Sequence, residues 1–266
     1  MKWNNNSQWQ LGYAKESERK DEIDAEGQDP EQILVAMRAA YPTFNPYAKA
    51  WNRLFWQGQQ GACQGHALAH AAQVMGVQKF GQLRYFSRAC GYYEAQRFDG
   101  LNGDKGSTLA GGRKVLSGDG LMLETDWPYP SRYNNRRPAN FPDAPRIRVD
   151  SSKQVRDADL IFDLLEAGAA IQTGLTWNSS CDQAVATRYQ SGGGGGHSTL
   201  LYGLDKQTGY AVHHNSWRNW NGDGRSLWSK DFIKGVLQRD RWCVFMAYQA
   251  IDVEADSGIF DAPAIT

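Results

Sequence analysis

The order of the predicted elements constrains the fold of this chain more than any other feature. Helical patterns occupy the first half, beginning with the Ala-rich segment Ala67–Met75, whose composition favours a buried helix. After residue 145 the pattern changes to short apolar runs of strand length. Chains that group helices first and strands later fold as α+β proteins, so we expect an α+β fold.

The predicted elements fall into two groups joined by an irregular stretch. Further helices are expected from Phe80 to Arg97, from Thr108 to Leu116 and over Asp159–Leu165. Strands are expected over Ala169–Thr173, Ser198–Leu204, Tyr210–His214 and Trp242–Ile251. Prolines punctuate the stretch from Trp127 to Pro145, which is the best candidate for a crossing between two lobes.

A chain of 266 residues has room for one large domain or two lobes that share a core. Residues 1–40 are polar and dense in charge, with a helix opening near Pro30, and we interpret them as an extension that serves as a tether, a lid or a short pro-segment. The predicted domain covers residues 41–255, with a helical lobe at about 50–140 and a β-rich lobe at about 145–255. Residues 256–266 form a C-terminal tail.

The charge balance and the apolar runs exclude several classes of partner. Twenty-nine Lys and Arg residues balance 29 Asp and Glu residues, so the net charge gives no reason to expect nucleic acid or an acidic membrane surface. No run approaches the roughly 18 apolar residues of a membrane span. The first residues also lack the apolar stretch of about 7–15 residues that a secretory signal needs.

The four cysteines, Cys63, Cys90, Cys181 and Cys243, are widely spaced and include no C-x-x-C pair. This spacing favours neither a zinc knuckle nor a disulfide framework. We therefore expect a cytoplasmic or otherwise reducing compartment, with association to a virion if the source is viral.

Cys63 lies where a Gly-punctuated loop enters the Ala-rich helix. A cysteine in such a helix is most often a small core residue. At the helix N-terminus, however, unpaired backbone N–H groups and the positive end of the dipole favour a thiolate. A nucleophile of this kind needs an imidazole to exchange protons and a third group to orient that imidazole. His197 and Asn215 are the candidates.

The tract of residues 191–196, SGGGGG, is the one low-complexity segment of the sequence. Composition alone favours a flexible surface linker. The tract runs directly into an apolar strand, and His197 lies at the junction. This placement weakens the interpretation as a linker.

Three segments resemble the papain-like cysteine proteases. They are residues 57–67, QGQQGACQGHA, residues 195–203, GGHSTLLYG, and residues 215–224, NSWRNWNGDG. Shorter matches between them are Ser87-Arg88, Tyr92-Tyr93, Asp104-Lys105-Gly106 and Trp127-Pro128-Tyr129. The blocks follow the family's order, with the nucleophile early and His and Asn late. The resemblance spans about residues 50–250 and is strongest to disulfide-poor microbial or viral members.

This resemblance implies a two-lobe fold, with a helical lobe, a β-barrel-like lobe and the active-site cleft between them. It implies that Cys63 attacks the scissile carbonyl, that His197 exchanges protons and that Asn215 holds the imidazole. Gln57 would donate to the oxyanion together with the Cys63 backbone N–H. Gly106 would bind an extended substrate strand.

The resemblance also implies substrate contacts for Ser107, Trp217 and Trp220, with Trp217 covering Asn215. Four positions depart from the family pattern. Gln60 replaces a disulfide cysteine, Gln64 replaces an aromatic residue, and Arg218 and Asn221 lie near positions where the family has Gly. The loop over Asn215 is one residue shorter than usual, so we expect it to be reshaped.

The remaining histidines and acids favour structural roles. His66 and His70 have i,i+4 spacing, but no third ligand follows from the sequence. His213 and His214 point to opposite faces of a strand, so only one of them can approach the site. Asp223 lies in a fragment of a calcium loop whose other ligands are missing. We expect no metal and no cofactor.

The sequence thus predicts a cysteine peptidase that hydrolyses polypeptides through a Cys-His-Asn triad and a thioester. Two alternatives stay open. One is a catalytically silent papain-fold structural or binding protein, and the other is an amidase or isopeptidase that uses the same triad. The expected partners are a polypeptide substrate and, through residues 1–40, a larger assembly.

Overall fold

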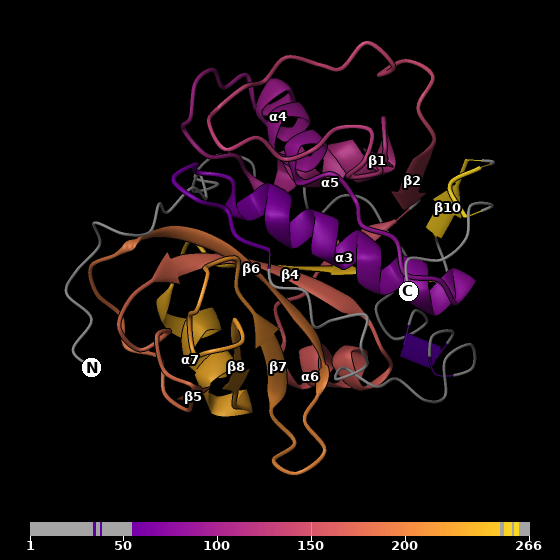
Figure 1. Cartoon of the computed structure of the whole chain (residues 1–266). Helices are drawn as coiled ribbons and strands as arrows, with labels where there is room; N and C mark the ends of the chain where they lie inside the picture. Colours follow the sequence, from indigo (N-terminus) through magenta and orange to yellow (C-terminus); the bar gives the residue numbers. More distant parts are fainter. Residues whose placement is uncertain are drawn as a thin grey trace.

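A computed structural model describes residues 34, 35, 38, 55–149, 151–250, 253–256 and 258–260. The helices are α3 (Cys63–Phe80), α4 (Arg88–Asp99), α5 (Leu109–Ser117), α6 (Ala158–Glu166) and α7 (Lys230–Arg239). The strands are β1 (Leu121–Met122), β2 (Arg146–Val149), β3 (Ser152–Gln154), β4 (Ala170–Trp177), β5 (Val185–Ala186), β6 (Gly195–Leu204), β7 (Ala211–His214), β8 (Arg225–Trp228), β9 (Val244–Tyr248) and β10 (Val253–Ala255). The expected α+β class is confirmed, with α3, α4 and α5 on one side and the larger sheet with α6 and α7 on the other (Figure 1).

The described strands form two sheets. The larger has the order β3-β9-β4-β6-β7-β8-β5, and its neighbours are antiparallel except for β5 and β8. The smaller has the order β1-β2-β10. The larger sheet is open, with β3 and β5 at its edges, so the barrel-like lobe that the resemblance implied is not a closed barrel over the described residues. Strands β2 and β10 pack with the helices α3 to α5, in one core with the helical lobe.

The central strands β4, β6, β7 and β9 of the larger sheet are buried on both faces. Successive side chains of a strand point to opposite sides, so neighbouring residues enter different cores. In β9, Met246 belongs to the core shared with α3, α4 and α5, whereas its neighbours Phe245 and Ala247 belong to the core shared with α6 and α7. In β6, Leu200 and Leu201 divide in the same way. Covering both faces explains why these strands read as continuous apolar runs rather than alternating ones.

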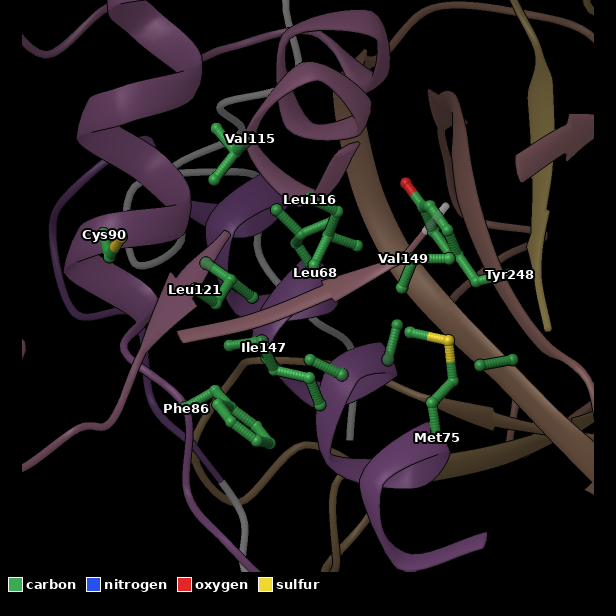
Figure 2. Close-up of a cluster of buried hydrophobic side chains, with 14 of the residues drawn as sticks. Leu68, Met75, Phe86, Cys90, Val115, Leu116, Leu121, Ile147, Val149 and Tyr248 are labelled. Atoms are coloured by element: carbon green, nitrogen blue, oxygen red, sulfur yellow. The ribbon is translucent and has the colours of Figure 1, made fainter. Parts of the chain in front are cut away.

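Helix α3 lies between the two halves of the molecule, packed against α4 on one side and against β4 and β6 on the other (Figure 1). Nearly its whole length is buried, so it lacks the polar face of a surface helix. Figure 2 shows the core on its helical side, where Leu68 of α3 meets Leu116 of α5 and Ile147 of β2. The first residue of this central helix is Cys63.

Glycines permit the close approach of α3 and α4. A Cβ on Gly65 would lie 2.6 Å from the backbone N of Tyr92 and 2.7 Å from the carbonyl of Arg88. On the facing helix, a Cβ on Gly91 would lie 3.1 Å from the carbonyl of Gly65. The backbones therefore touch directly, and this contact fixes how far Cys63 stands from the helical lobe.

Side-chain caps explain where the other helices begin. Ser87 accepts from the backbone N–H of Cys90 and starts α4, so the helix expected from Phe80 is in fact interrupted before Arg88. Ser229 caps α7, a helix for which the sequence pattern gave no prediction. Such caps satisfy N–H groups that have no partner within the helix. Helix α3, in contrast, begins at Cys63, and its N-cap residue Ala62 provides no side-chain hydrogen bond.

The expected positions of the other elements agree with the structure to within a few residues. The helix predicted from Thr108 is α5, the one predicted over Asp159–Leu165 is α6, and the four predicted strands correspond to β4, β6, β7 and β9, with the last predicted longer than β9. Gly195 and Gly196 belong to β6, so the end of the glycine tract is strand rather than linker. No helix of the described chain is long and apolar enough to cross a membrane.

Most of the N-terminal extension lies outside the described residues, and its predicted role stays a prediction. Leu34 and Val35 are helical, and Leu34 is buried in the core that contains α6. Arg38 forms ion pairs with Asp163 and Glu166 of α6, at 3.6 and 3.4 Å. This part of the extension therefore contacts α6.

The contact between α3 and α4 generates the first prediction. Gly65→Ala adds a Cβ against backbone atoms that cannot rotate away, so we expect the free energy of unfolding to fall by about 1–3 kcal/mol, measured by urea denaturation. Gly76→Ala on the same helix is the matched control, because its Cβ would meet only side-chain atoms at 3.4 to 3.6 Å. Equal effects of the two substitutions would contradict the proposed backbone contact.

Candidate active site

Cys63 opens the uncapped end of α3. Without a capping side chain, the first-turn N–H groups and the positive end of the helix dipole act on the Cys63 sulfur. Its Sγ accepts a hydrogen bond from the backbone N–H of Ser198, at 3.4 Å. The structure thus brings the sulfur against Ser198 of β6, the residue after His197, although His197 lies 134 residues further along the sequence. Cys63 is fully buried.

His197 and Asn215 are hydrogen bonded to one another. The Nε2 atom of His197 lies 2.8 Å from Oδ1 of Asn215. The backbone N–H of Ser216 donates to the same Oδ1 at 2.7 Å, which fixes the orientation of the carboxamide. Because Oδ1 only accepts, Nε2 carries the proton and Nδ1 has a free lone pair. Among the described residues, Nδ1 has no hydrogen-bond partner.

Strand pairing positions this pair. His197 lies near the start of β6, opposite Leu175 of β4. The neighbouring strand β7 ends at His214, so Asn215 is the first residue beyond it. The backbone N–H of Asn215 donates to the carbonyl of Gly224 at 2.8 Å, which holds the residue in place after the strand has ended.

Tryptophans surround the imidazole of His197. Trp217 stacks on it with ring centroids 4.4 Å apart and an interplanar angle of 21°, and Trp177 meets it edge to face at 4.9 Å. Burial lowers the pKa of His197 to about 4, although its hydrogen bond to Oδ1 of Asn215 acts in the opposite direction. The imidazole is therefore neutral near pH 7 and able to accept a proton.

Gln57 is hydrogen bonded to Ser216, the residue that follows Asn215. Its backbone N–H donates to the carbonyl of Ser216 at 3.0 Å, and the Ser216 hydroxyl donates to its Oε1 at 2.5 Å. Its Nε2 donates to the carbonyl of Gln60 at 3.0 Å. Both ends of the carboxamide are therefore held, six residues before Cys63.

The expected substrate-contact residues have partners inside the protein. The N–H of Gly106 donates to the hydroxyl of Tyr92, and its carbonyl accepts from Gln96. The Ser107 hydroxyl donates to Gln64, and Trp220 is buried against Trp177. Their roles in binding substrate stay predictions.

The two departures before and after Cys63 have structural explanations. Gln60 donates to the carbonyl of Pro130 and accepts from the Tyr93 hydroxyl, both at 2.7 Å. Together with the bond from the Gly61 N–H to Asp104, at 2.8 Å, this ties the loop before Cys63 to the helical lobe. The Gln64 amide fills the space beside Gly112, where a Cβ would lie 1.8 Å from its Nε2.

The other histidines are buried near the site. His213 stacks on Trp228 at 4.2 Å, whereas His214 meets His70 at 4.2 Å, so the neighbours face opposite sides of β7 as expected. His66, His70 and His214 line a cavity of about 10 Å³. No group of three or more metal-binding side chains in the described chain is arranged to hold a metal ion.

Sequence reasoning missed several residues that shape the site. Trp177 contacts His197 only because β4 pairs with β6, with Trp177 opposite Gly195. Ser216 joins Asn215 to Gln57, although a serine between Asn and Trp carries no chemical signal of its own. Pairing register and loop contact between distant segments are not encoded in local patterns, so only the folded chain reveals them.

Comparisons with solved structures identify the fold. Xylellain, a cysteine protease from Xylella fastidiosa, is 20% identical with a TM-score of 0.69, over 93% of this chain and 99% of that one. The cysteine protease CMS1MS2 of Carica candamarcensis, in complex with E-64, is 15% identical with a TM-score of 0.57, over 74% and 92%. The proform of the ragweed cysteine protease Amb a 11 is 17% identical with a TM-score of 0.58, over 74% and 61%.

No protein-family model matches the sequence, and no curated protein sequence does. The structural likeness is nevertheless extensive, and the element order agrees with the two-lobe arrangement that the motifs implied. The protein has the papain-like fold.

The buried histidines generate the second prediction. Burial lowers the pKa of His66 and of His70 to about 3. The positive charge of Arg88 lowers the pKa of His66 further, and that of Arg225 lowers the pKa of His70 further. In the unfolded chain both histidines keep a pKa near 6.5. The unfolded state therefore binds protons first as pH falls. Each such histidine should lower the free energy of unfolding by about 2 kcal/mol between pH 7 and pH 5.

His70→Gln should remove about 2 kcal/mol of that pH-dependent loss, measured by urea denaturation at pH 7 and pH 5. The carboxylates titrate mostly below this window, so they contribute little. Asp231→Asn, an exposed change on α7, is the control and should keep the full dependence. An unchanged dependence in His70→Gln would show that this histidine is protonated in the folded protein.

Proposed function

We propose that this protein is a papain-like cysteine peptidase that cleaves polypeptides through Cys63, His197 and Asn215. One observation carries the proposal. The His197 imidazole is hydrogen bonded to a carboxamide whose orientation is fixed, and a cysteine sulfur at an uncapped helix N-terminus lies against the next residue, Ser198. The cysteine proteases among the structural neighbours support the same chemistry.

The first half-reaction begins with a proton transfer. The Cys63 thiol gives its proton to Nδ1 of His197, the nitrogen left with a lone pair by the Asn215 hydrogen bond. The thiolate attacks the peptide carbonyl and forms a C–S bond, and charge develops on the carbonyl oxygen. The C–N bond then breaks as Nδ1–H of His197 protonates the leaving amine. The product is a thioester on Cys63.

The second half-reaction releases the acyl group. His197 takes a proton from a water molecule, which attacks the thioester carbonyl. The C–S bond breaks, and the proton returns from His197 to the Cys63 sulfur. The carboxylic acid product leaves, and the enzyme regains its starting form.

Gln57 is proposed to stabilise the developing oxyanion with its side-chain amide, beside the Cys63 backbone N–H. A donor that is already held before the reaction costs little reorganisation when charge develops. The hydrogen bonds of Gln57 to Ser216 and Gln60 support this role, because they restrict its carboxamide.

Access to the site is part of the proposal. Cys63 and His197 are fully buried, so a substrate reaches the sulfur only after a local opening of the structure. A thiol probe of low mass measures this opening and the nucleophilicity of the sulfur in one experiment.

Labelling with E-64 generates the third prediction. E-64, bound by the Carica candamarcensis relative, should form one covalent adduct on Cys63 under reducing conditions, detected by peptide mass spectrometry. His197→Ala should slow this labelling by at least about 100-fold, because the base that activates the thiol is lost.

Cys90 is the matched internal control. It is also fully buried, and burial raises its pKa to about 12. If E-64 labels Cys63 and not Cys90, a difference in exposure cannot be the reason, because both cysteines are fully buried. Labelling that persists in Cys63→Ala, or that fails in the wild type, would favour a catalytically silent papain-fold protein.

Substitution of Gln57 generates the fourth prediction. Gln57→Ala should lower kcat for a cleaved peptide by about 10²- to 10³-fold, the effect of removing one oxyanion donor. Ser216→Ala, which removes only the hydroxyl bound to Gln57 Oε1, should have a smaller effect. A kcat unchanged in Gln57→Ala would exclude Gln57 from the oxyanion site. Activity on isopeptide or non-peptide amide bonds alone would redirect the proposal to an amidase.

A further inference from the structure

An exposed aromatic and a cation stand beside the proposed active site. Trp56 directly precedes Gln57 and is 44% exposed. Arg218 directly follows Trp217 and is exposed, and its Cζ lies 5.6 Å from the centroid of the Trp56 ring. The hydrogen bond from the Gln57 N–H to the Ser216 carbonyl holds these two chain segments side by side.

The charge of Arg218 has no carboxylate partner among the described residues. Other arginines do have one, since Arg88 pairs with Glu124 and Arg137 pairs with Glu94. The guanidinium of Arg218 instead lies over an indole that is itself partly open to solvent. The Arg218 guanidinium can pair with a carboxylate, and the Trp56 indole can pack against methylene groups. Together they are suited to bind the side chain of Asp or Glu.

The loop that carries Arg218 is fixed rather than free. Asn219 and Asn221 adopt positive φ angles of 60° and 49°, a conformation that Asn tolerates better than most residues. The N–H of Gly224 donates to the carbonyl of Trp220 at 2.8 Å, and the Trp220 side chain is buried below. The backbone that carries Arg218 is therefore held beside Trp56 before any ligand binds, which lowers the entropic cost of binding.

The proposed mechanism determines which part of a substrate meets this pair. His197 must protonate the leaving amine, so the segment after the scissile bond lies on the flank of His197. Trp217 stacks on His197, and Arg218 is the next residue. Gly106, in contrast, belongs to the helical lobe, where its N–H is bound to the hydroxyl of Tyr92.

We propose that Trp56 and Arg218 form a subsite for the residues that follow the scissile bond, and that it selects Asp or Glu there. This inference rests on the proposed peptidase function. The carboxylate pairs with the guanidinium, and the methylene groups of the acidic side chain pack on the indole. The arginine that departs from the family pattern is thus the residue that determines specificity.

The test uses a peptide library digested by the full-length protein, with the cleavage positions read by mass spectrometry. The best-cleaved sequence is then synthesised in a pair that differs only by Glu or Gln at the first or second position after the cleaved bond. Glu and Gln have nearly the same size, so the ratio of their kcat/KM values isolates the charge. We expect the wild type to favour Glu by about 3- to 10-fold, as for a partly exposed ion pair.

Variants of Arg218 test whether this residue causes the preference for the Glu peptide over the Gln peptide. Arg218→Gln should bring it close to one, and Arg218→Glu should invert it. In the wild type the ratio should also fall as salt rises from 50 to 500 mM, because ions screen an exposed pair. Arg241→Gln is the matched control, since Arg241 also lies over a tryptophan, Trp242, at 4.6 Å, and should leave the ratio unchanged.

The outcomes separate the two proposals. Cleavage with a ratio near one, or a ratio that persists in Arg218→Gln, would overturn the subsite while leaving the peptidase function intact. Failure to cleave any peptide, together with no E-64 adduct on Cys63, would overturn the peptidase function and the subsite with it.

Discussion

The direct contact between the backbones of α3 and α4 is the constraint on which the rest of the structure depends. Gly65 and Gly91 let the two helices touch, and α3 then spans the molecule between the helical lobe and the larger sheet. Cys63 begins that helix, so the packing of the core also determines where the sulfur stands relative to β6. The site is therefore built from the interior, where Nε2 of His197 is held 2.8 Å from Oδ1 of Asn215.

The sequence predicted the parts of the fold that depend on local pattern and on ordered motifs. The Ala-rich composition after Cys63 indicated a buried helix, and the blocks around His197 and Asn215 indicated which distant segments would meet. The start of α4 at Ser87, the existence of α7 and the open larger sheet were not predicted, because they depend on capping and strand pairing. The contact of Trp177 with His197 has the same origin, since it follows from a register that no local pattern encodes.

The interior of this protein contains buried histidines. All five histidines of the chain are buried. His213 packs on Trp228 and His70 on His214, whereas His66 meets Tyr129. Burial disfavours the charged imidazole, so it lowers the pKa of these side chains and keeps them neutral near pH 7. The same property serves the proposed chemistry at His197, where a fixed partner on Nε2 determines the state of Nδ1.

The hydrogen bonds of Gln60 have a consequence for the response of the protein to its redox surroundings. Where a disulfide would join the loop before Cys63 to the helical lobe, Tyr93 and Pro130 bind the Gln60 amide instead. None of the four cysteines forms a disulfide. Millimolar glutathione or dithiothreitol therefore finds no S–S bond to break, and the architecture tolerates the same reductants that protect the Cys63 sulfur from oxidation.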